Sequence, residues 1–238
     1  MLYFTTYPKE SHLRDILDCW PGLLQKSHLL NSADILVYLA GAASDHKLIA
    51  NWRAALHALS LGNKRKATLH LADNPGYQEG AMKAMDQLLQ KGWGDGYDWV
   101  IRLNPDVLIY DDNYLDLFFR SSHLTSVLAN CSPHMEAERA KVMTDFLAFR
   151  PGHLFRDAFA DWRVRKNAEW QASSAFKDMI LNRTCAWLVP RHDSPSCRTR
   201  GNGVYHHETK HNPSSTCTAV MREQPWKLKN VVLPAIPA

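Results

Sequence analysis

The stretch that decides the fold is residues 97–112, which read YDWVIRLNPDVLIYDD. Residues 98–103 form an apolar run bounded by polar residues, which predicts a buried β-strand that ends at Asn104-Pro105-Asp106. In an open α/β sheet, ligands bind beyond the carboxyl ends of the strands. Asp106 follows such an end. Its carboxylate therefore suits a divalent cation that bridges phosphate oxygens, and it equally suits a cap on the next turn.

Strand-like and helical segments alternate on both sides of this stretch. The expected strands before it are 2–6, 33–39 and 67–71, and the expected helices are 11–19, 48–61 with Asp45 as N-cap, and 77–90, with a break at Pro21-Gly22. After it we expect strands at 125–129, 145–149 and 185–189, and helices at 152–162 and 169–181. Such alternation is typical of a mostly parallel sheet with helices on both faces.

The composition is that of a globular protein with a sizeable core. Of its 238 residues, 45% are hydrophobic and 22% are charged. No apolar run reaches the roughly 18 residues that cross a membrane, so no membrane span is predicted. The formal net charge of +4 suits an anionic small ligand as well as it suits nucleic acid.

The cysteine pattern bears on the compartment. The five cysteines, Cys19, Cys131, Cys185, Cys197 and Cys217, lie far apart, which is not the pattern of a disulfide framework. We therefore expect reduced thiols and a cytoplasmic protein. The N-terminus lacks the basic segment and cleavage site of a signal peptide. A strand that begins at Leu2 and a proline-rich end at 231–238 indicate a linker and neighbouring domains of a longer chain.

The order of these segments, with the polar triplet near residue 105, resembles the GT-A fold of nucleotide-sugar glycosyltransferases over about residues 1–210. Small glycosyltransferase domains of algae, fungi and large algal viruses are similar. The family hallmark is Asp-x-Asp at a strand end, and here Asn104 stands in place of the first acid. The resemblance implies an α/β, GT-A-like fold with a Rossmann-type, mostly parallel central sheet. It also implies one domain over 1–230, with a donor-binding half at about 1–112, an acceptor-binding half at about 113–212 and a tail at 231–238.

The resemblance implies a donor site assembled from several strand ends. Family members hold the nucleobase after the first strand, and small residues near 74–81 let a ligand approach the backbone. Late arginines clamp the diphosphate. The donor-binding residues expected on this basis are Thr5, Thr6, Tyr7, Asn74, Gly76, Gly80, Arg102, Asn104, Asp106, Arg198 and Arg200. Asp106 is also expected to hold Mn²⁺ or Mg²⁺ together with His206, which is favoured over His207.

Two carboxylates are candidates for catalysis on the acceptor side. An inverting transferase needs one general base on the acceptor hydroxyl. Asp145 begins the expected strand 145–149, which resembles the family strand beneath the donor sugar, and Glu169 begins the expected helix 169–181. We expect Glu169 to be the base and Asp145 to hydrogen-bond the donor sugar. A glutamate in a first helical turn is, however, also favoured by the helix dipole alone.

The sequence therefore predicts a glycosyltransferase, expected to be inverting, that moves a sugar from a nucleotide-diphosphate donor, above all a UDP-sugar, to a hydroxyl of a glycan or glycoprotein acceptor. The alternative is a non-catalytic nucleotide- or glycan-binding module of the same fold, which Asn104 keeps open. A zinc-stabilised nucleic-acid binder is a third class. Its candidate ligands Cys197, His207, His211 and Cys217 include no Cys-x-x-Cys pair, and nucleic acid is not an expected partner.

Overall fold

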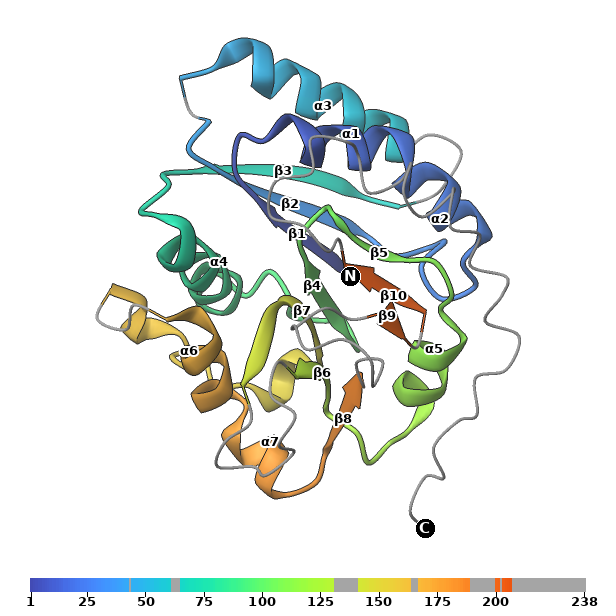
Figure 1. Cartoon of the computed structure of the whole chain (residues 1–238), viewed down its shortest axis with the longest axis vertical. Helices are drawn as coiled ribbons and strands as arrows, with labels where there is room; N and C mark the ends of the chain where they lie inside the picture. Colours follow the sequence, from blue (N-terminus) through green and yellow to red (C-terminus); the bar gives the residue numbers. More distant parts are fainter. Residues whose placement is uncertain are drawn as a thin grey trace.

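A computed structural model of the chain describes residues 1–42, 44–60, 65–130, 141–163, 167–188, 200–201 and 203–206. A seven-stranded sheet forms the centre, in the order β3-β2-β1-β4-β7-β6-β8. Its strands are β1 (Leu2–Thr6), β2 (Ile35–Ala40), β3 (Ala67–Ala72), β4 (Val100–Leu103), β6 (Ser126–Asn130), β7 (Val142–Phe149) and β8 (Cys185–Leu188). Strand β7 runs antiparallel to β4 and β6, and the other neighbours are parallel (Figure 1).

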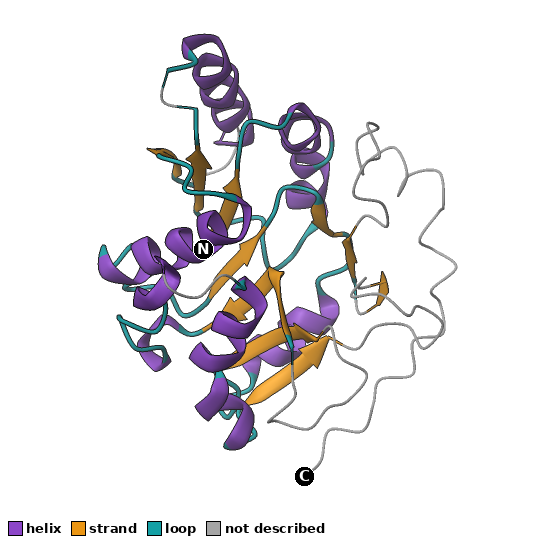
Figure 2. Cartoon of the chain, turned by 60° about the vertical axis from the view of Figure 1, so that its left-hand side comes forward, coloured by secondary structure: helices purple, strands orange, loops and turns teal. Residues whose placement is uncertain are grey.

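Helices cover both faces of this sheet (Figure 2). Leu2 and Phe4 of β1 face one core, which is completed by α1 (Glu10–Asp18), α2 (Trp20–Lys26), α3 (His46–Ser60) and α5 (Asn113–Arg120). Tyr3, between them, faces the other core with α4 (Tyr77–Gln90), α6 (Ala168–Ala175) and α7 (Lys177–Leu181). Alternate residues of one strand thus serve opposite cores. The expected α/β class, a mostly parallel sheet with helices on both faces, is confirmed.

A small second sheet brings the late part of the chain beside β4. Its strands are β5 (Val107–Ile109), β9 (Arg200–Gly201) and β10 (Val204–His206), in the order β5-β10-β9. β10 pairs antiparallel with β5, so that His206 lies opposite Val107 in the backbone register. Val107, the residue after Asp106, is therefore the backbone partner of His206, about a hundred positions later in the sequence.

Gly203 makes this pairing possible. Its φ of +81° is one that residues with a Cβ rarely adopt, and a Cβ there would overlap the carbonyl oxygen of Asp111. The Gly203 carbonyl accepts from the Tyr110 and Asp111 amides at 2.9 and 3.3 Å. We expect Gly203→Ala to free these two amides for fast hydrogen exchange. Gly96→Ala is the matched control, because Gly96 has a φ of +84° and open space around it. Equal exchange at Tyr110 and Asp111 in both variants would contradict this role.

Several expected boundaries hold and others need correction. Helix α4 has the expected limits, and Asp45 caps α3, since the Leu48 amide donates to its Oδ1 at 2.9 Å. β7 begins at Val142, so Asp145 lies within the strand and does not begin it. The expected break at Pro21-Gly22 is wrong, because α2 contains both residues and proline is tolerated in a first helical turn.

The segment after β7 is less helical than expected. In place of one helix at 152–162, the structure has two short 3₁₀ turns, Pro151–His153 and Ala160–Arg163. Leu154 and Phe159 of this segment are buried, whereas Phe155 is exposed. The expected helix 169–181 is divided into α6 and α7 at Phe176, whose φ and ψ of −95° and 7° leave the helical region.

Cys19 corrects one expectation about the thiols. This residue, between α1 and α2, is disulfide-bonded. Cys185 is a free thiol, and burial raises its pKa to about 12. Since disulfides persist mainly in oxidising compartments, the cysteines no longer support the cytoplasmic location expected from them. Across the described part of the chain, we find no helix with the length and apolarity to cross a membrane.

Candidate active site

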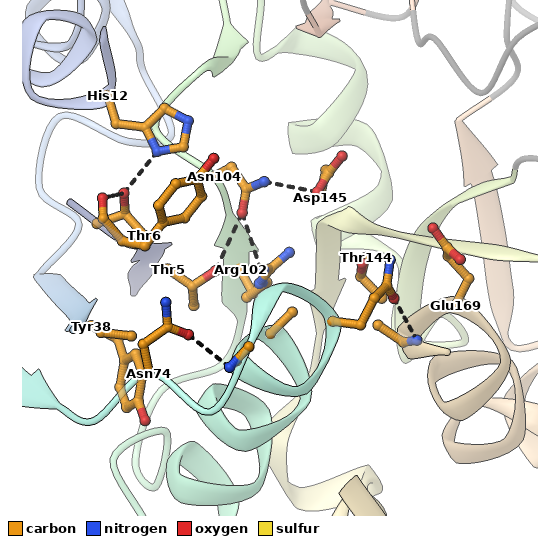
Figure 3. Close-up of a pocket in the computed structure, with 17 residues that line it drawn as sticks. Thr5, Thr6, His12, Tyr38, Asn74, Arg102, Asn104, Thr144, Asp145 and Glu169 are labelled. Carbon is orange, nitrogen blue, oxygen red and sulfur yellow. Dashed lines mark hydrogen bonds between the residues drawn. The ribbon is translucent and has the colours of Figure 1, made fainter. Parts of the chain in front are cut away.

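A cleft opens where the carboxyl ends of β1, β2 and β4 meet β7, α4 and α6 (Figure 3). This is the edge of the sheet at which α/β proteins bind ligands. The predicted site residues that line it are Thr5, Thr6, Tyr7, Asn74, Gly76, Gly80, Arg102, Asn104, Asp145 and Glu169. The cleft therefore joins both predicted carboxylates with most of the predicted donor side.

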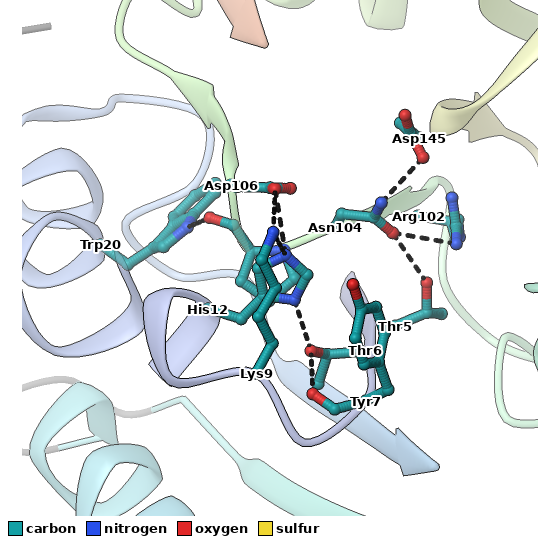
Figure 4. Close-up of polar contacts among 11 residues, drawn as sticks. Thr5, Thr6, Tyr7, Lys9, His12, Trp20, Arg102, Asn104, Asp106 and Asp145 are labelled. Atoms are coloured by element: carbon teal, nitrogen blue, oxygen red, sulfur yellow. Dashed lines mark hydrogen bonds and ion pairs between the residues drawn. The ribbon is translucent and has the colours of Figure 1, made fainter. Parts of the chain in front are cut away.

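Asn104 links three strands at the floor of the cleft (Figure 4). Its Oδ1 accepts from an Arg102 guanidinium N–H at 3.1 Å and from the Thr5 hydroxyl at 3.4 Å. Its Nδ2 donates to Asp145 Oδ1 at 2.7 Å. Arg102 is only 2% exposed. The amide thus connects a buried guanidinium to a carboxylate, and a carboxylate in its place could not donate to Asp145.

This network predicts the effect of restoring the family acid. Asn104→Asp would set two carboxylates against each other, and we expect it to lower the free energy of unfolding by about 1–3 kcal/mol. Asn113→Asp is the matched control, because exposed Asn113 donates from its Nδ2 to Asp111 Oδ1 at 2.8 Å. In water that change should cost no more than about 0.5 kcal/mol. Urea denaturation of both variants measures the difference, and equal losses would contradict the network.

Asp106 is not in the cleft wall but directly behind it. Its side chain is buried, at 5% exposed, and its Oδ2 lies 3.0 Å from His12 Nε2 and 3.5 Å from Lys9 Nζ. A carboxylate only accepts, so His12 Nε2 carries the proton of that hydrogen bond. His12 Nδ1 lies 2.7 Å from Thr6 Oγ1, and the His12 ring lines the cleft. Asp106 is therefore tied to the residues that follow β1.

The remaining predicted metal ligand and clamp residues are only partly placed. The backbone of His206 lies opposite Val107, one residue after Asp106, as a shared site requires. The side chains of His206 and Arg200 and all of Arg198 lie outside what the structure describes. The metal site of Asp106 with His206 stays a prediction.

The described donor set fits a divalent ion poorly. Asp106 faces the Lys9 ammonium, and the Asn104 amide oxygen already accepts from Arg102 and Thr5. A divalent ion on Asp106 would be repelled by that ammonium. No group of three or more His, Cys, Asp and Glu side chains suited to a metal gathers within the described ranges.

Glu169 lies at the rim of the cleft, in the first turn of α6. Asn167 caps this helix by accepting from the Trp170 amide at 2.9 Å, and Gln78 of α4 accepts from the Ala168 amide at 2.7 Å. The Glu169 carboxylate lies 3.6 Å from Lys141 Nζ and is partly exposed. Asp145, on β7, is buried to a similar extent and accepts from Asn104 Nδ2 at 2.7 Å. The two carboxylates therefore lie on different elements of one cleft and have different partners.

The wall of the cleft also contains polar and aromatic residues that were not predicted, namely His12, Tyr38, Gln78 and Thr144. Lys9, which was not predicted either, lies behind the cleft. Mainly through burial, the pKa of Tyr38 is raised to about 12, so its hydroxyl stays protonated. That hydroxyl is buried and has no hydrogen-bond partner among the described residues. Tyr38 lies two residues before the end of β2. This position was the signal available, because parallel strand ends meet at one edge.

Neither a family model nor a curated protein matches the chain. Among solved structures, the chain is similar to the glycosyltransferase GlyE of Streptococcus pneumoniae TIGR4, at 15% identity and a TM-score of 0.46 over 79% of this chain. The chain spans 45% of the length of GlyE. It is also similar to an active-site mutant of the glycosyltransferase LgtC, at 12% identity and a TM-score of 0.49 over 88% of both chains. Both neighbours are glycosyltransferases, and the functional argument for this chain rests on the residues of the cleft.

Proposed function

We propose that the chain is a glycosyltransferase that moves a sugar from a nucleoside-diphosphate donor, in the first place a UDP-sugar, to a hydroxyl of a glycan. One observation carries the proposal. The carboxyl-end cleft contains two carboxylates with different partners: Asp145 is joined through Asn104 to the buried Arg102 guanidinium, and Glu169 lies 3.6 Å from Lys141 Nζ. A donor sugar needs fixed hydrogen-bonding groups deep in a site, and an acceptor hydroxyl needs a base near the entrance.

The donor would occupy the side of the cleft formed by β1, β2 and the start of α4. Gly76, Gly80 and Tyr38 line this side of the cleft. The N-terminus of α4 favours negative charge, as a diphosphate has. Arg102 and Asp145 would then meet the sugar hydroxyls at the floor.

The reaction we propose is inverting. Glu169 takes the proton of the acceptor hydroxyl while that oxygen forms a bond to the anomeric carbon of the donor. The bond from that carbon to the diphosphate oxygen breaks, and the diphosphate leaves with the electron pair. Glu169 suits the base role better than Asp145, because Asp145 Oδ1 already accepts from Asn104 at 2.7 Å.

Donor binding separates this function from classes without a nucleotide ligand. We expect one nucleotide sugar among UDP-, GDP- and CDP-linked donors to raise the melting temperature in a thermal-shift screen, run with Mn²⁺ and with EDTA. At 100 times its dissociation constant, a ligand adds about 2.7 kcal/mol of stability. In a protein of this size, that is a shift of about 5–11 °C. A folded protein that no donor stabilises in either buffer would contradict the proposal.

The alternative of a non-catalytic module of the same fold predicts the same shift without turnover. Release of nucleoside diphosphate from the stabilising donor distinguishes the two. The presence of both Asp145 and Glu169 in one cleft favours the enzyme, because a module that only binds has no use for a base at the rim.

A further inference from the structure

We propose that Lys9 binds the diphosphate of the donor and supplies the positive charge that a divalent ion would otherwise provide. This inference rests on the proposed function and concerns how the leaving group is stabilised. It differs from the sequence expectation, which assigned that charge to Mn²⁺ or Mg²⁺ on Asp106. The observation behind it is the cluster of Lys9, His12 and Asp106 at the carboxyl ends of β1 and β4.

The cluster holds Lys9 in one place. Lys9 Nζ lies 3.5 Å from Asp106 Oδ2 and 3.2 Å from His12 Nε2. Both nitrogen donors converge on one buried carboxylate oxygen. The Lys9 side chain is 29% exposed, against 5% for Asp106. An ammonium has three N–H donors, so Lys9 can pair with Asp106 and still offer donors on its exposed side.

His12 connects this cluster to the cleft. Its ring lies between Asp106 and Thr6 Oγ1, and it packs edge-on against Tyr7 with ring centres 5.6 Å apart. His12, Thr6 and Tyr7 all line the cleft. Figure 4 shows Lys9 and His12 on the same side of Asp106, next to Tyr7. Lys9 does not itself line the cleft, but its Nζ lies 3.2 Å from Nε2 of His12, which does.

The start of α1 adds a second attraction for an anion at the same place. Lys9 is the N-cap residue of this nine-residue helix, and no described side chain caps it. The first amides of a helix have no intrahelical acceptor, and the helix dipole favours negative charge there. The Lys9 ammonium and these amides thus share one end of α1. Lysine is a common phosphate ligand that acts as a point charge.

The same residues disfavour a divalent ion. Where the family has Asp-x-Asp, this chain has Asn104, whose oxygen accepts from Arg102 and Thr5. The remaining acid, Asp106, already faces the Lys9 ammonium. An ion bound there would have to displace that ammonium or lie beside it. The Lys9 ammonium is already in place as part of the chain, so it can act without displacing or approaching another cation.

The test is calorimetric binding of UDP, GDP, ADP and CDP to the whole chain, in Mn²⁺ and in EDTA. We expect one nucleoside diphosphate to bind with the same affinity in both buffers, within about twofold. Lys9→Met should weaken that binding at least about tenfold, and Lys9→Arg should retain most of it because the charge remains. Lys47→Met, at an exposed position on α3, is the matched control and should bind as wild type.

Each result decides the inference. A requirement for Mn²⁺, or indifference of binding to Lys9→Met, overturns it and leaves the proposed function intact. Absence of binding by all four diphosphates in both buffers overturns the proposed function as well. The comparison of Mn²⁺ with EDTA uses only the wild-type protein, so it decides the need for a metal even if Lys9→Met fails to fold.

Discussion

Glu169→Gln is expected to reduce the rate of sugar transfer by about 10²–10⁴-fold, which is the usual contribution of a general base. The amide has the same shape but cannot take the proton of the acceptor hydroxyl. Donor affinity should stay at the wild-type value, because Glu169 lies at the rim of the cleft beside Lys141 and away from the Arg102 network. Transfer rates and donor dissociation constants measure the two effects separately.

The control for this variant is Asp178→Asn, which removes one carboxylate from the exposed first turn of α7. It should leave both quantities unchanged. Transfer by Glu169→Gln at the wild-type rate would show that Glu169 is not the base. The role would then pass to Asp145, or to a retaining mechanism that needs no such base.

Asp145→Asn is expected to weaken donor binding about 10–100-fold and to lower transfer as well. A hydrogen bond to a charged group is worth about 1.5–3 kcal/mol, and this carboxylate is the acid joined through Asn104 to the buried Arg102. When the negative charge of Asp145 is removed, less negative charge remains to balance the buried Arg102 guanidinium. Donor titration of the variant, with folding checked by its melting temperature, measures the effect.

The contrast between the two variants is the informative result. Glu169→Gln should change the rate alone, and Asp145→Asn should change both affinity and rate. If Asp145→Asn binds donor as tightly as wild type and only loses rate, the two assignments would have to be exchanged. Asp178→Asn again serves as the control for loss of a carboxylate.

Much of the fold could be predicted because its signals are local. The apolar run before Asn104 predicts a buried strand, and the three- and four-residue spacing in 48–61 predicts a helix. The cleft followed from a general rule, since polar residues after parallel strands meet at one edge. The resemblance implied one donor site for Thr5, Asn74 and Asn104, and all three line the cleft; their donor-binding role stays a prediction.

The parts that were not predicted depend on contacts between distant residues. The hydrogen bond between His12 and Asp106 joins residues 94 positions apart, and nothing local to His12 indicates it. Tyr38 lies within an apolar run of the sequence, and only the structure places it in the wall of the cleft. Pro21 was read as a break, although proline at the start of a helix is compatible with it.

The most direct test of the central claim is release of nucleoside diphosphate from a nucleotide sugar by the intact chain. UDP-glucose, UDP-galactose, UDP-N-acetylglucosamine and GDP-mannose would be incubated with the protein in Mn²⁺ and in EDTA, and the released nucleoside diphosphate measured. We predict release from at least one donor, reduced in Asp145→Asn and unchanged in Asp178→Asn. Folded protein that releases no nucleotide from any donor in either buffer, or release that Asp145→Asn leaves unchanged, would contradict the assignment of this cleft as a glycosyltransferase site.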